Sequence, residues 1–346
     1  MEGISLAGSV HSGLRALDLI REHPPDLVTL DFEMPGQDGL VTLKQIMEFN
    51  ASRKDGKPVG VVMLSSHTRA GAEISMKAIE LGAFDFIPKP TTPDPETGIK
   101  YLREQLLPRI RAFLRNRGEP TRASGLRLAI KPPTIDSTPT KPSPRRTLRA
   151  VLVAVSTGGP RALNTLLSGL KGIRVPILIV QHMPPDFTLS LAQSLSRTTG
   201  IQVIEATDNE PLRPGVAYLA PGGMHMVVRN TPGLGFLAGL SDLPPEEGCR
   251  PSANYLFRTG ASVYGPDCVG IILTGMGRDG VQGLASLKRQ GGLVIAQDEA
   301  TSTVWGMPGA AVQAGLADMV LPLEQIATAI QSIRGPGDSR RMEPLP

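Results

Sequence analysis

Three residues in the second half of the chain, Ser156, His182 and Asp279, are of the types that together cleave esters and amides. Each follows an apolar run of the kind that forms a buried parallel strand, and the carboxyl ends of such strands share one edge of the sheet. The runs are 150–155, 176–181 and 268–274. A nucleophile, a proton acceptor and an orienting carboxylate would then meet, so the pattern indicates a serine hydrolase.

The residues after Ser156 favour this interpretation, because Thr157-Gly158-Gly159-Pro160 leads directly into a helical pattern. Glycines allow a sharp turn, proline suits a first helical position, and a helix N-terminus stabilises an oxyanion. Each residue taken alone has a plainer alternative: Ser156 as a helix cap, His182 as a loop histidine, Asp279 as a turn residue. The order Ser, His, Asp and the alanine at position 154 differ from the α/β-hydrolase pattern.

The first part of the chain alternates short apolar runs, beginning with residues 4–7, with helical patterns, which predicts a parallel sheet flanked by helices. Asp31, Ser65 and Lys89 each follow one of the later runs. A carboxylate, a hydroxyl and an ammonium in one crevice could hold a phosphoryl group, with the carboxylate as acceptor. Separately, each would be an ordinary turn or loop residue.

The chain has 346 residues, of which 40% are hydrophobic and 20% charged, enough for two globular domains. We expect a first domain at 1–114, a Pro/Arg-rich linker at 115–147, a second domain at 148–334 and a disordered tail at 335–346. Nine basic and two acidic residues lie between positions 115 and 149, so the net charge of +4 belongs to the linker.

Other features of the composition concern location and partners. Two cysteines, Cys249 and Cys268, are too few for a disulfide framework, and the first residues lack a signal peptide. No apolar run approaches the ~20 residues that cross a bilayer. We therefore expect a cytoplasmic protein that does not insert into the membrane. We expect no nucleic-acid partner, because the basic residues lie in a linker and no helix-turn-helix pattern follows the first domain.

The strings Asp31-Phe32-Glu33-Met34-Pro35-Gly36-Gln37-Asp38-Gly39 and Gly82-Ala83-Phe84-Asp85-Phe86-Ile87-Pro88-Lys89-Pro90 resemble the receiver domain of response regulators. Almost the whole chain, from Gly3 to about Arg334, resembles the chemotaxis-type protein-glutamate methylesterases, in which a receiver is joined by a linker to a catalytic domain. Besides the three strings that contain Ser156, His182 and Asp279, the matching strings include Ala220-Pro221-Gly222-Gly223-Met224-His225-Met226, Arg250-Pro251-Ser252, Ala296-Gln297-Asp298-Glu299-Ala300 and Gly306-Met307-Pro308. The resemblance implies a flavodoxin-like receiver followed by a three-layer α/β/α catalytic domain with a mainly parallel sheet.

The resemblance also implies an activity and its partners: hydrolysis of glutamate methyl esters on methyl-accepting chemoreceptors, with deamidation of receptor glutamines. Ser156 would be the nucleophile, His182 the general acid and base, and Asp279 its orienting carboxylate. The Met276 N–H would help to form the oxyanion hole, and Thr157 would support the site. No cofactor is implied for hydrolysis.

The receiver is implied to regulate this activity. Asp31 would take phosphate from a chemotaxis histidine kinase and thereby relieve occlusion of the active site, with Ser65 and Lys89 as switch residues. Mg²⁺ would serve this phosphorylation only, with Asp31 as a ligand.

The receiver pattern is incomplete, because family members begin with a strand that ends in an acidic pair for Mg²⁺, followed by a helix. This sequence starts too late for either, so we expect either an upstream start or a degenerate receiver that binds Mg²⁺ poorly. Two smaller departures lie at Ala154 and Asn254, where the family commonly has glycine and an acidic residue. The alternative function is a non-catalytic signalling module in which both domains serve as a binding surface.

Overall fold

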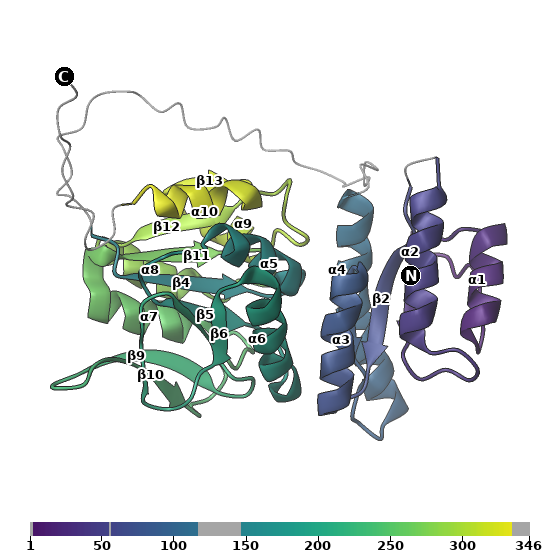
Figure 1. Cartoon of the computed structure of the whole chain (residues 1–346), viewed down its shortest axis with the longest axis horizontal. Coiled ribbons are helices and arrows are strands. Elements are labelled where there is room, and N and C mark those ends of the chain that lie inside the picture. The colour runs from purple at the N-terminus through teal and green to yellow at the C-terminus, as the bar shows by residue number, and fades with distance from the viewer. Residues whose placement is uncertain (1–2, 55–56, 117–146, 334–346) are drawn as a thin grey trace.

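The computed structural model describes residues 3–54, 57–116 and 147–333, which form two α/β domains lying side by side (Figure 1). The predicted linker, apart from residues 115, 116 and 147, and the predicted tail lie outside these ranges. Among the described residues, no helix is both long enough and apolar enough to span a membrane.

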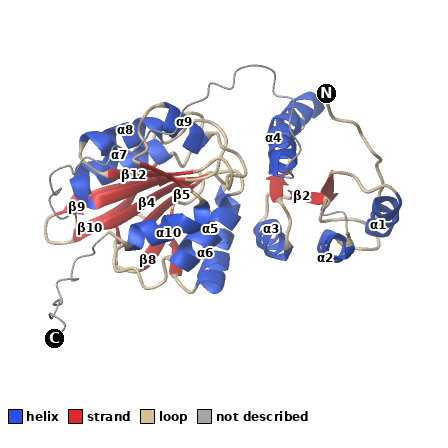
Figure 2. Cartoon of the chain, turned by 90° about the horizontal axis from the view of Figure 1, so that it is seen from above, coloured by secondary structure: helices blue, strands red, loops and turns tan. Residues whose placement is uncertain are grey.

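The first domain contains a parallel sheet of three strands in the order β1-β2-β3. Helices α2 and α3 cover one face of this sheet and α4 the other (Figure 2). Its elements are α1 (Gly13–Glu22), β1 (Leu27–Asp31), α2 (Gly39–Ser52), β2 (Gly60–Ser65), α3 (Arg69–Leu81), β3 (Asp85–Pro88) and α4 (Pro95–Asn116).

Residues 4–7 form no strand, so this part of the alternating pattern was a wrong prediction. Most of their side chains are exposed, and no described strand pairs with them. An apolar run without a neighbour gains neither ladder hydrogen bonds nor burial, and nothing stabilises it as a strand.

The second domain contains an all-parallel sheet of seven strands in the order β13-β12-β11-β4-β5-β8-β6, and a small antiparallel sheet in the order β7-β10-β9. Helices α7, α8 and α9 cover one face of the large sheet and α5, α6 and α10 the other (Figure 2). The large sheet and its helices are β4 (Ala150–Val155), α5 (Gly159–Gly169), β5 (Ile177–Gln181), α6 (Pro185–Thr199), β6 (Gln202–Glu205), β8 (Val216–Leu219), α7 (Ala253–Tyr264), β11 (Cys268–Ile272), α8 (Val281–Arg289), β12 (Leu293–Gln297), α9 (Met307–Gln313), β13 (Met319–Leu321) and α10 (Leu323–Gln331). The remaining elements are β7 (Glu210–Pro211), β9 (His225–Thr231), β10 (Gly235–Ser241) and the short 3₁₀ helix η1 (Gly265–Asp267).

The apolar runs became the centre of the large sheet because helices cover both of its faces. Every residue of β4, β5 and β11 is buried. Strands without a solvent-facing side read as continuous apolar sequences rather than as alternating ones. The observed architecture confirms the predicted α/β fold, with a receiver followed by a three-layer domain.

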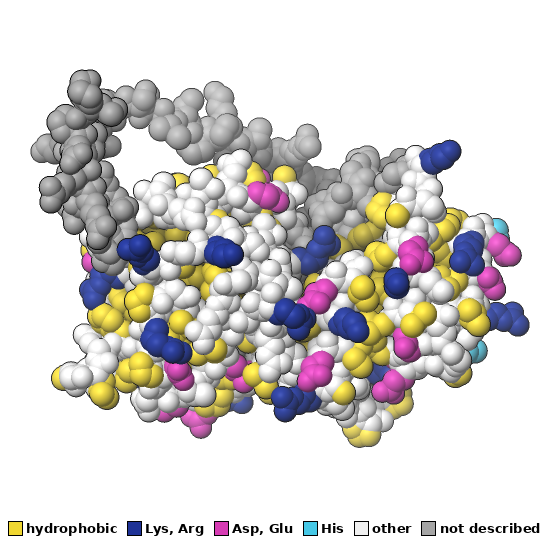
Figure 3. Space-filling model, viewed as in Figure 1, with side chains coloured by type: hydrophobic (Ala, Val, Ile, Leu, Met, Phe, Trp, Pro, Cys, Tyr) yellow, Lys and Arg dark blue, Asp and Glu magenta, His cyan; other side chains and the backbone are white. Residues whose placement is uncertain are grey.

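The two domains contact each other through α3 and α6, whose facing surfaces combine apolar and charged groups. The rings of Phe86 and Phe187 stack with centroids 5.0 Å apart. Glu80 on α3 accepts hydrogen bonds from Ser194 Oγ at 2.5 Å and from Arg197 Nη2 at 2.6 Å. On the face shown in Figure 3, acidic and basic side chains are intermixed. The receiver is thus held against the second domain by specific contacts.

Candidate active site

The order of the central strands brings the three predicted triad residues to one edge of the large sheet. Strand β4 pairs with β5 on one side and β11 on the other, and all three run parallel. Ser156 directly follows β4, His182 directly follows β5, and Asp279 lies in the loop between β11 and α8. Ligands of open α/β sheets bind at the carboxyl ends of such strands.

Ser156 lies at a sharp turn from β4 into α5. The turn is possible because Gly158 has a φ of +77°, and a Cβ on this residue would collide with the side chain of Thr303. The Ser156 carbonyl accepts hydrogen bonds from the Gly159 N–H at 2.8 Å and from Gln181 Nε2 at 3.0 Å. The strand, glycine turn and helix predicted around this serine are therefore present.

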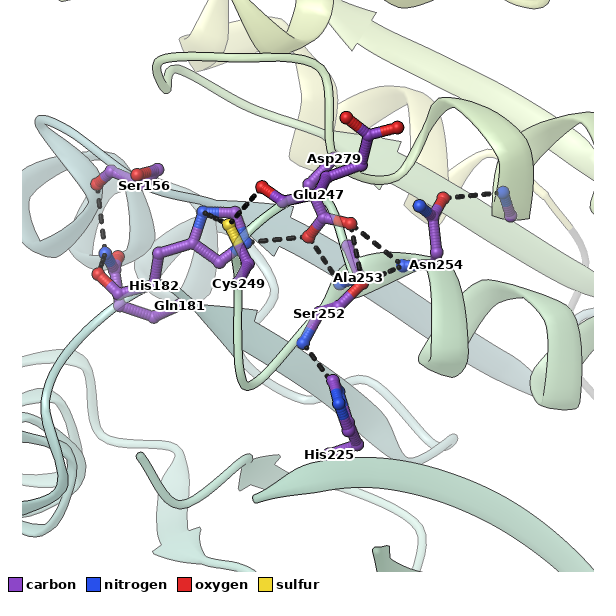
Figure 4. Close-up of polar contacts among 11 residues, drawn as sticks. Ser156, Gln181, His182, His225, Glu247, Cys249, Ser252, Ala253, Asn254 and Asp279 are labelled. Atoms are coloured by element: carbon purple, nitrogen blue, oxygen red, sulfur yellow. Dashed lines mark hydrogen bonds and ion pairs between the residues drawn. The ribbon is translucent and has the colours of Figure 1, made fainter. Parts of the chain in front are cut away.

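His182, which is partly buried, and Asp279, which is buried, form a pair in which Nε2 lies 2.7 Å from Oδ2 (Figure 4). A carboxylate only accepts hydrogen bonds, so Nε2 carries the hydrogen of this bond. In the neutral ring, the lone pair then lies on Nδ1. Nδ1 is therefore the nitrogen of His182 that can accept a proton.

The Asp279 carboxylate is held in place by the N-terminus of α7. The Ala253 N–H donates to Oδ2 at 2.7 Å, and the Ser252 hydroxyl donates to Oδ1 at 2.6 Å. Burial raises the pKa of this carboxyl group, but the bond to His182 and the donors on α7 outweigh burial and lower the pKa below its ordinary value. Asp279 therefore stays ionised and keeps the histidine ring oriented.

The pKa of His182 is raised to about 9 by its neighbours. Burial favours the neutral ring and lowers the pKa, but hydrogen bonds to Asp279 and Cys249 favour the imidazolium and outweigh burial. Cys249 Sγ lies 3.8 Å from Nδ1. Among the described residues, no hydrogen bond joins Ser156 Oγ to His182, and the Cys249 sulfur is the group that contacts Nδ1.

Met276 and Thr157 flank the nucleophile. Gly275 lies so close to Ser156 that a Cβ on this glycine would approach the serine Cβ to 2.7 Å, and Met276 is the residue that follows this glycine. Thr157 is buried, and its carbonyl accepts a hydrogen bond from Thr274 Oγ1 at 2.9 Å.

Ser156 and His182 line a cavity of about 320 Å³ that the receiver closes on one side. The receiver contributes Tyr101, Asp85 and Arg109, and the Arg109 Nε donates to Asp85 Oδ2 at 2.8 Å. A substrate on another protein therefore cannot approach the triad from this side while the domains are in contact.

The receiver residues singled out by the sequence come together only in part. Lys89 Nζ lies 2.8 Å from Asp31 Oδ2, and both residues line one pocket. The Ser65 hydroxyl points elsewhere: it is buried and donates to the Gly71 carbonyl at 3.0 Å. The neighbouring Ser66 lines the pocket instead.

The described residues around Asp31 do not assemble a convincing Mg²⁺ site. Mg²⁺ prefers oxygen ligands in near-octahedral geometry. Here one oxygen of Asp31 is paired with Lys89, and no group of three His, Cys, Asp or Glu side chains among the described residues converges at this carboxylate. The described residues around Asp31 therefore do not fit Mg²⁺.

Four further residues shape the site but had no place in the predicted triad. His225 is buried and accepts a hydrogen bond from the Ser252 N–H at 3.1 Å, which fixes the residue that holds Asp279. Gln181 Nε2 bridges the carbonyls of Ser156 and His182. Cys249 contacts His182 Nδ1 through its sulfur, a contact that the count of two cysteines in the sequence does not indicate. The strings around His225 and Ser252 were visible in the sequence, but their contacts were not.

These features define a class of two-domain protein, in which a small α/β domain packs against an α/β domain whose central strands bring a serine, a histidine and an aspartate to one edge of the sheet. Residues 151–330 match the CheB methylesterase family, and residues 1–97 match the response regulator receiver domain. The chain belongs to the CheB methylesterase family.

Similar proteins cover nearly the whole chain. A protein-glutamate methylesterase/protein-glutamine glutaminase from Nocardioides sp. is 40% identical over 94% of this chain and 87% of its own length. A protein of the same name from Desulfotalea psychrophila is 42% identical over 95% of this chain and 91% of its own length. The crystal structure of the Thermotoga maritima CheB methylesterase catalytic domain, 38% identical, covers 54% of this chain and 98% of that domain with a TM-score of 0.52.

Proposed function

We propose that the protein hydrolyses glutamate methyl esters on methyl-accepting chemoreceptors and deamidates receptor glutamines at the same site. The observation that carries this proposal is the hydrogen-bonded His182–Asp279 pair, with Ser156 lining the same cavity as His182, at the carboxyl ends of three adjacent strands. The names of the relatives supply the substrate class. The intact pair gives the alternative of a non-catalytic module no support.

In the first half of the reaction, the Ser156 hydroxyl attacks the ester carbonyl while His182 Nδ1 takes its proton. The Met276 N–H and the N-terminus of α5 stabilise the tetrahedral oxyanion. Collapse of the intermediate breaks the bond to the methoxy group, to which His182 returns the proton, so methanol leaves and an acyl-enzyme remains.

In the second half, a water molecule gives a proton to His182 and attacks the acyl-enzyme. Collapse of this second intermediate breaks the bond to Ser156 Oγ, and His182 returns the proton to that oxygen, so that Ser156 is regenerated and the glutamate side chain of the receptor is freed. A primary amide passes through the same tetrahedral intermediate, with ammonia as the leaving group. One triad therefore serves both substrates. Asp279 stabilises the imidazolium that forms in each half.

We further propose that the receiver controls access to the triad through Asp31. A chemotaxis histidine kinase would phosphorylate this residue, which ends β1 and contacts Lys89. The new charge would disturb this pair and weaken the contact between α3 and α6, so that the cavity opens. The wall that the receiver contributes to the cavity supports this proposal.

We propose that the chain is divided into a receiver at 1–114, a linker at 115–147, a catalytic domain at 148–334 and a tail at 335–346. We propose a cytoplasmic enzyme that works at the membrane only by contacting chemoreceptors, and that needs no cofactor for hydrolysis.

The test is methanol release from methylated chemoreceptor membranes by the full chain and by residues 148–346, each with and without a small phosphodonor and Mg²⁺. We expect the shorter chain to be active without phosphodonor and the full chain to respond to it. Absence of methanol from both chains would overturn the proposed activity. A full chain that is active but indifferent to phosphodonor would overturn the proposed control.

A further inference from the structure

The sulfur of Cys249 lies beside Nδ1 of His182, the ring nitrogen that is not hydrogen-bonded to Asp279. The Sγ atom lies 3.8 Å from Nδ1, whereas Nε2 contacts Asp279 at 2.7 Å (Figure 4). A thiol sulfur, an imidazole nitrogen and a carboxylate oxygen of these residues all lie within 4.8 Å of one another. Within the part of the chain that the structure describes, this is the one group of three possible metal ligands.

The position of the thiol is set by the backbone. Cys249 ends a tight turn in which its N–H donates to the Glu246 carbonyl at 2.9 Å and its carbonyl accepts from the Glu246 N–H at 3.2 Å. Glu247 and Gly248 at the centre of the turn have φ values of +52° and +74°, as a type I′ turn requires. Arg258 holds the Glu246 side chain with both of its terminal nitrogens.

The distance between sulfur and nitrogen suits a shared metal ion. Zinc binds thiolate sulfur at ~2.3 Å and imidazole nitrogen at ~2.0 Å, so the two atoms lie ~3.5 Å apart in a tetrahedral site. The observed 3.8 Å needs only a small rotation of the Cys249 side chain. Thiolate and imidazole are also the ligands that zinc prefers over the oxygen ligands of harder cations.

Asp279 contacts His182 in the way that a carboxylate commonly contacts a metal-binding histidine. Such a histidine commonly donates its second ring N–H to a carboxylate, which fixes the ring and makes the ligating nitrogen more basic. The Asp279–His182 bond supplies this arrangement, with Nδ1 left for an ion.

An ion can reach this place from solvent. Cys249 and His182 line the same cavity as Ser156, and Cys249 is half-buried. The thiol now donates to the Glu247 carbonyl at 3.6 Å. When the sulfur binds a metal ion it can no longer donate to the Glu247 carbonyl. Residue 247 is exposed, so a water molecule can donate to this carbonyl instead.

We propose that Cys249 Sγ and His182 Nδ1 bind a soft divalent cation, Zn²⁺ in the first place, with Asp279 orienting the histidine and water completing the coordination. The bound ion occupies the lone pair that would accept the proton of Ser156, so it inhibits hydrolysis. The inhibition rests on the proposed function, whereas the binding of the ion does not.

Binding is tested with Co²⁺ as a spectroscopic substitute for Zn²⁺, because thiolate ligation produces a charge-transfer band in the near ultraviolet. The full chain is titrated alongside Cys249→Ser and Cys268→Ala. Cys268 is the other cysteine of the chain and is buried in β11, which makes it a matched control. We expect the band, and its loss on adding Zn²⁺, in the parent chain and in Cys268→Ala but not in Cys249→Ser. A parent chain without the band, or a band that survives in Cys249→Ser, would overturn the site.

Inhibition is tested by methyl-ester hydrolysis with increasing Zn²⁺, each chain being compared with its own metal-free rate. We expect the Zn²⁺ concentration for half-inhibition to rise about tenfold or more in Cys249→Ser, and to stay unchanged in Cys268→Ala. Equal sensitivity of all three chains would contradict inhibition through Cys249. If the metal-free parent chain hydrolyses no ester, the proposed function fails, and the cobalt titration still decides the metal site.

Discussion

Asp279 and His182 are 97 positions apart in the sequence, yet Oδ2 of the aspartate lies 2.7 Å from Nε2 of the histidine. The carboxylate is 2% exposed and also accepts hydrogen bonds from Ser252 and from the Ala253 N–H. This relationship decides which ring nitrogen is the base. It also makes the charge of Asp279 essential, since a neutral amide could not stabilise the imidazolium.

Asp279→Asn should reduce the rate of methyl-ester hydrolysis by about 10³–10⁴-fold, because the amide presents the wrong hydrogen-bonding groups to the ring. The measurement is the single-turnover rate of methanol release. Asp267→Asn, which changes a carboxyl group in η1 away from the triad, is the control and should keep the parent rate. A comparable rate in Asp279→Asn would show that this carboxylate does not orient the base.

The rate should rise with pH, because only neutral His182 accepts the proton of Ser156 and its pKa is raised to about 9. Below this value the neutral fraction grows about tenfold per pH unit, and the rate should follow it until it levels near the pKa. The measurement is the pH profile of hydrolysis with chemistry rate-limiting, after subtraction of the alkaline background. A flat profile between about pH 5 and pH 8 would exclude a histidine base with this pKa.

The contact of Glu80 with Ser194 and Arg197 should restrain the full chain when no phosphodonor is present. Glu80→Ala should raise the basal rate of methanol release by at most about fivefold, since a partly exposed ion pair is worth about 0–1 kcal/mol. Glu73→Ala is the matched control, because Glu73 lies on the same helix and pairs with Arg69 within it. Equal effects of the two substitutions would assign the change to α3 itself rather than to the domain contact.

Asp31→Asn should remove the response of the full chain to a phosphodonor, because an amide cannot form the acyl phosphate. Glu33→Gln changes another acidic residue of the same pocket and should keep the response. The measurement is the ratio of methanol release with and without phosphodonor. A response that persists in Asp31→Asn would place the phosphoacceptor elsewhere.

The strands that carry the proposed triad could be predicted from the sequence, because β4, β5 and β11 are buried on both faces and read as unbroken apolar runs. The sequence did not predict strand β10, because its glycines at 235 and 239 interrupt the apolar pattern and its position depends on pairing with β9. The direction of the Ser65 hydroxyl likewise depends on contacts with Gly71 and Ser75 on α3.

The surroundings of the triad could not be predicted for a related reason. Cys249 meets His182 across 67 positions, and Ser252 meets Asp279 across 27. Neither spacing has a helical or strand period. Such contacts arise only when the loops at the carboxyl edge of the sheet are folded together, so a single sequence marks the residues without showing their partners.

The most direct test of the account is methanol release by Ser156→Ala from methylated chemoreceptor membranes, compared with the parent chain under the same conditions. Ser156 follows β4 and lies beside the cavity, so the alanine should fold normally, as circular dichroism and the thermal unfolding midpoint would show. We predict that the folded variant releases no methanol above the uncatalysed background. Methanol release at the parent rate by a folded Ser156→Ala chain would contradict the assignment of this serine as the nucleophile.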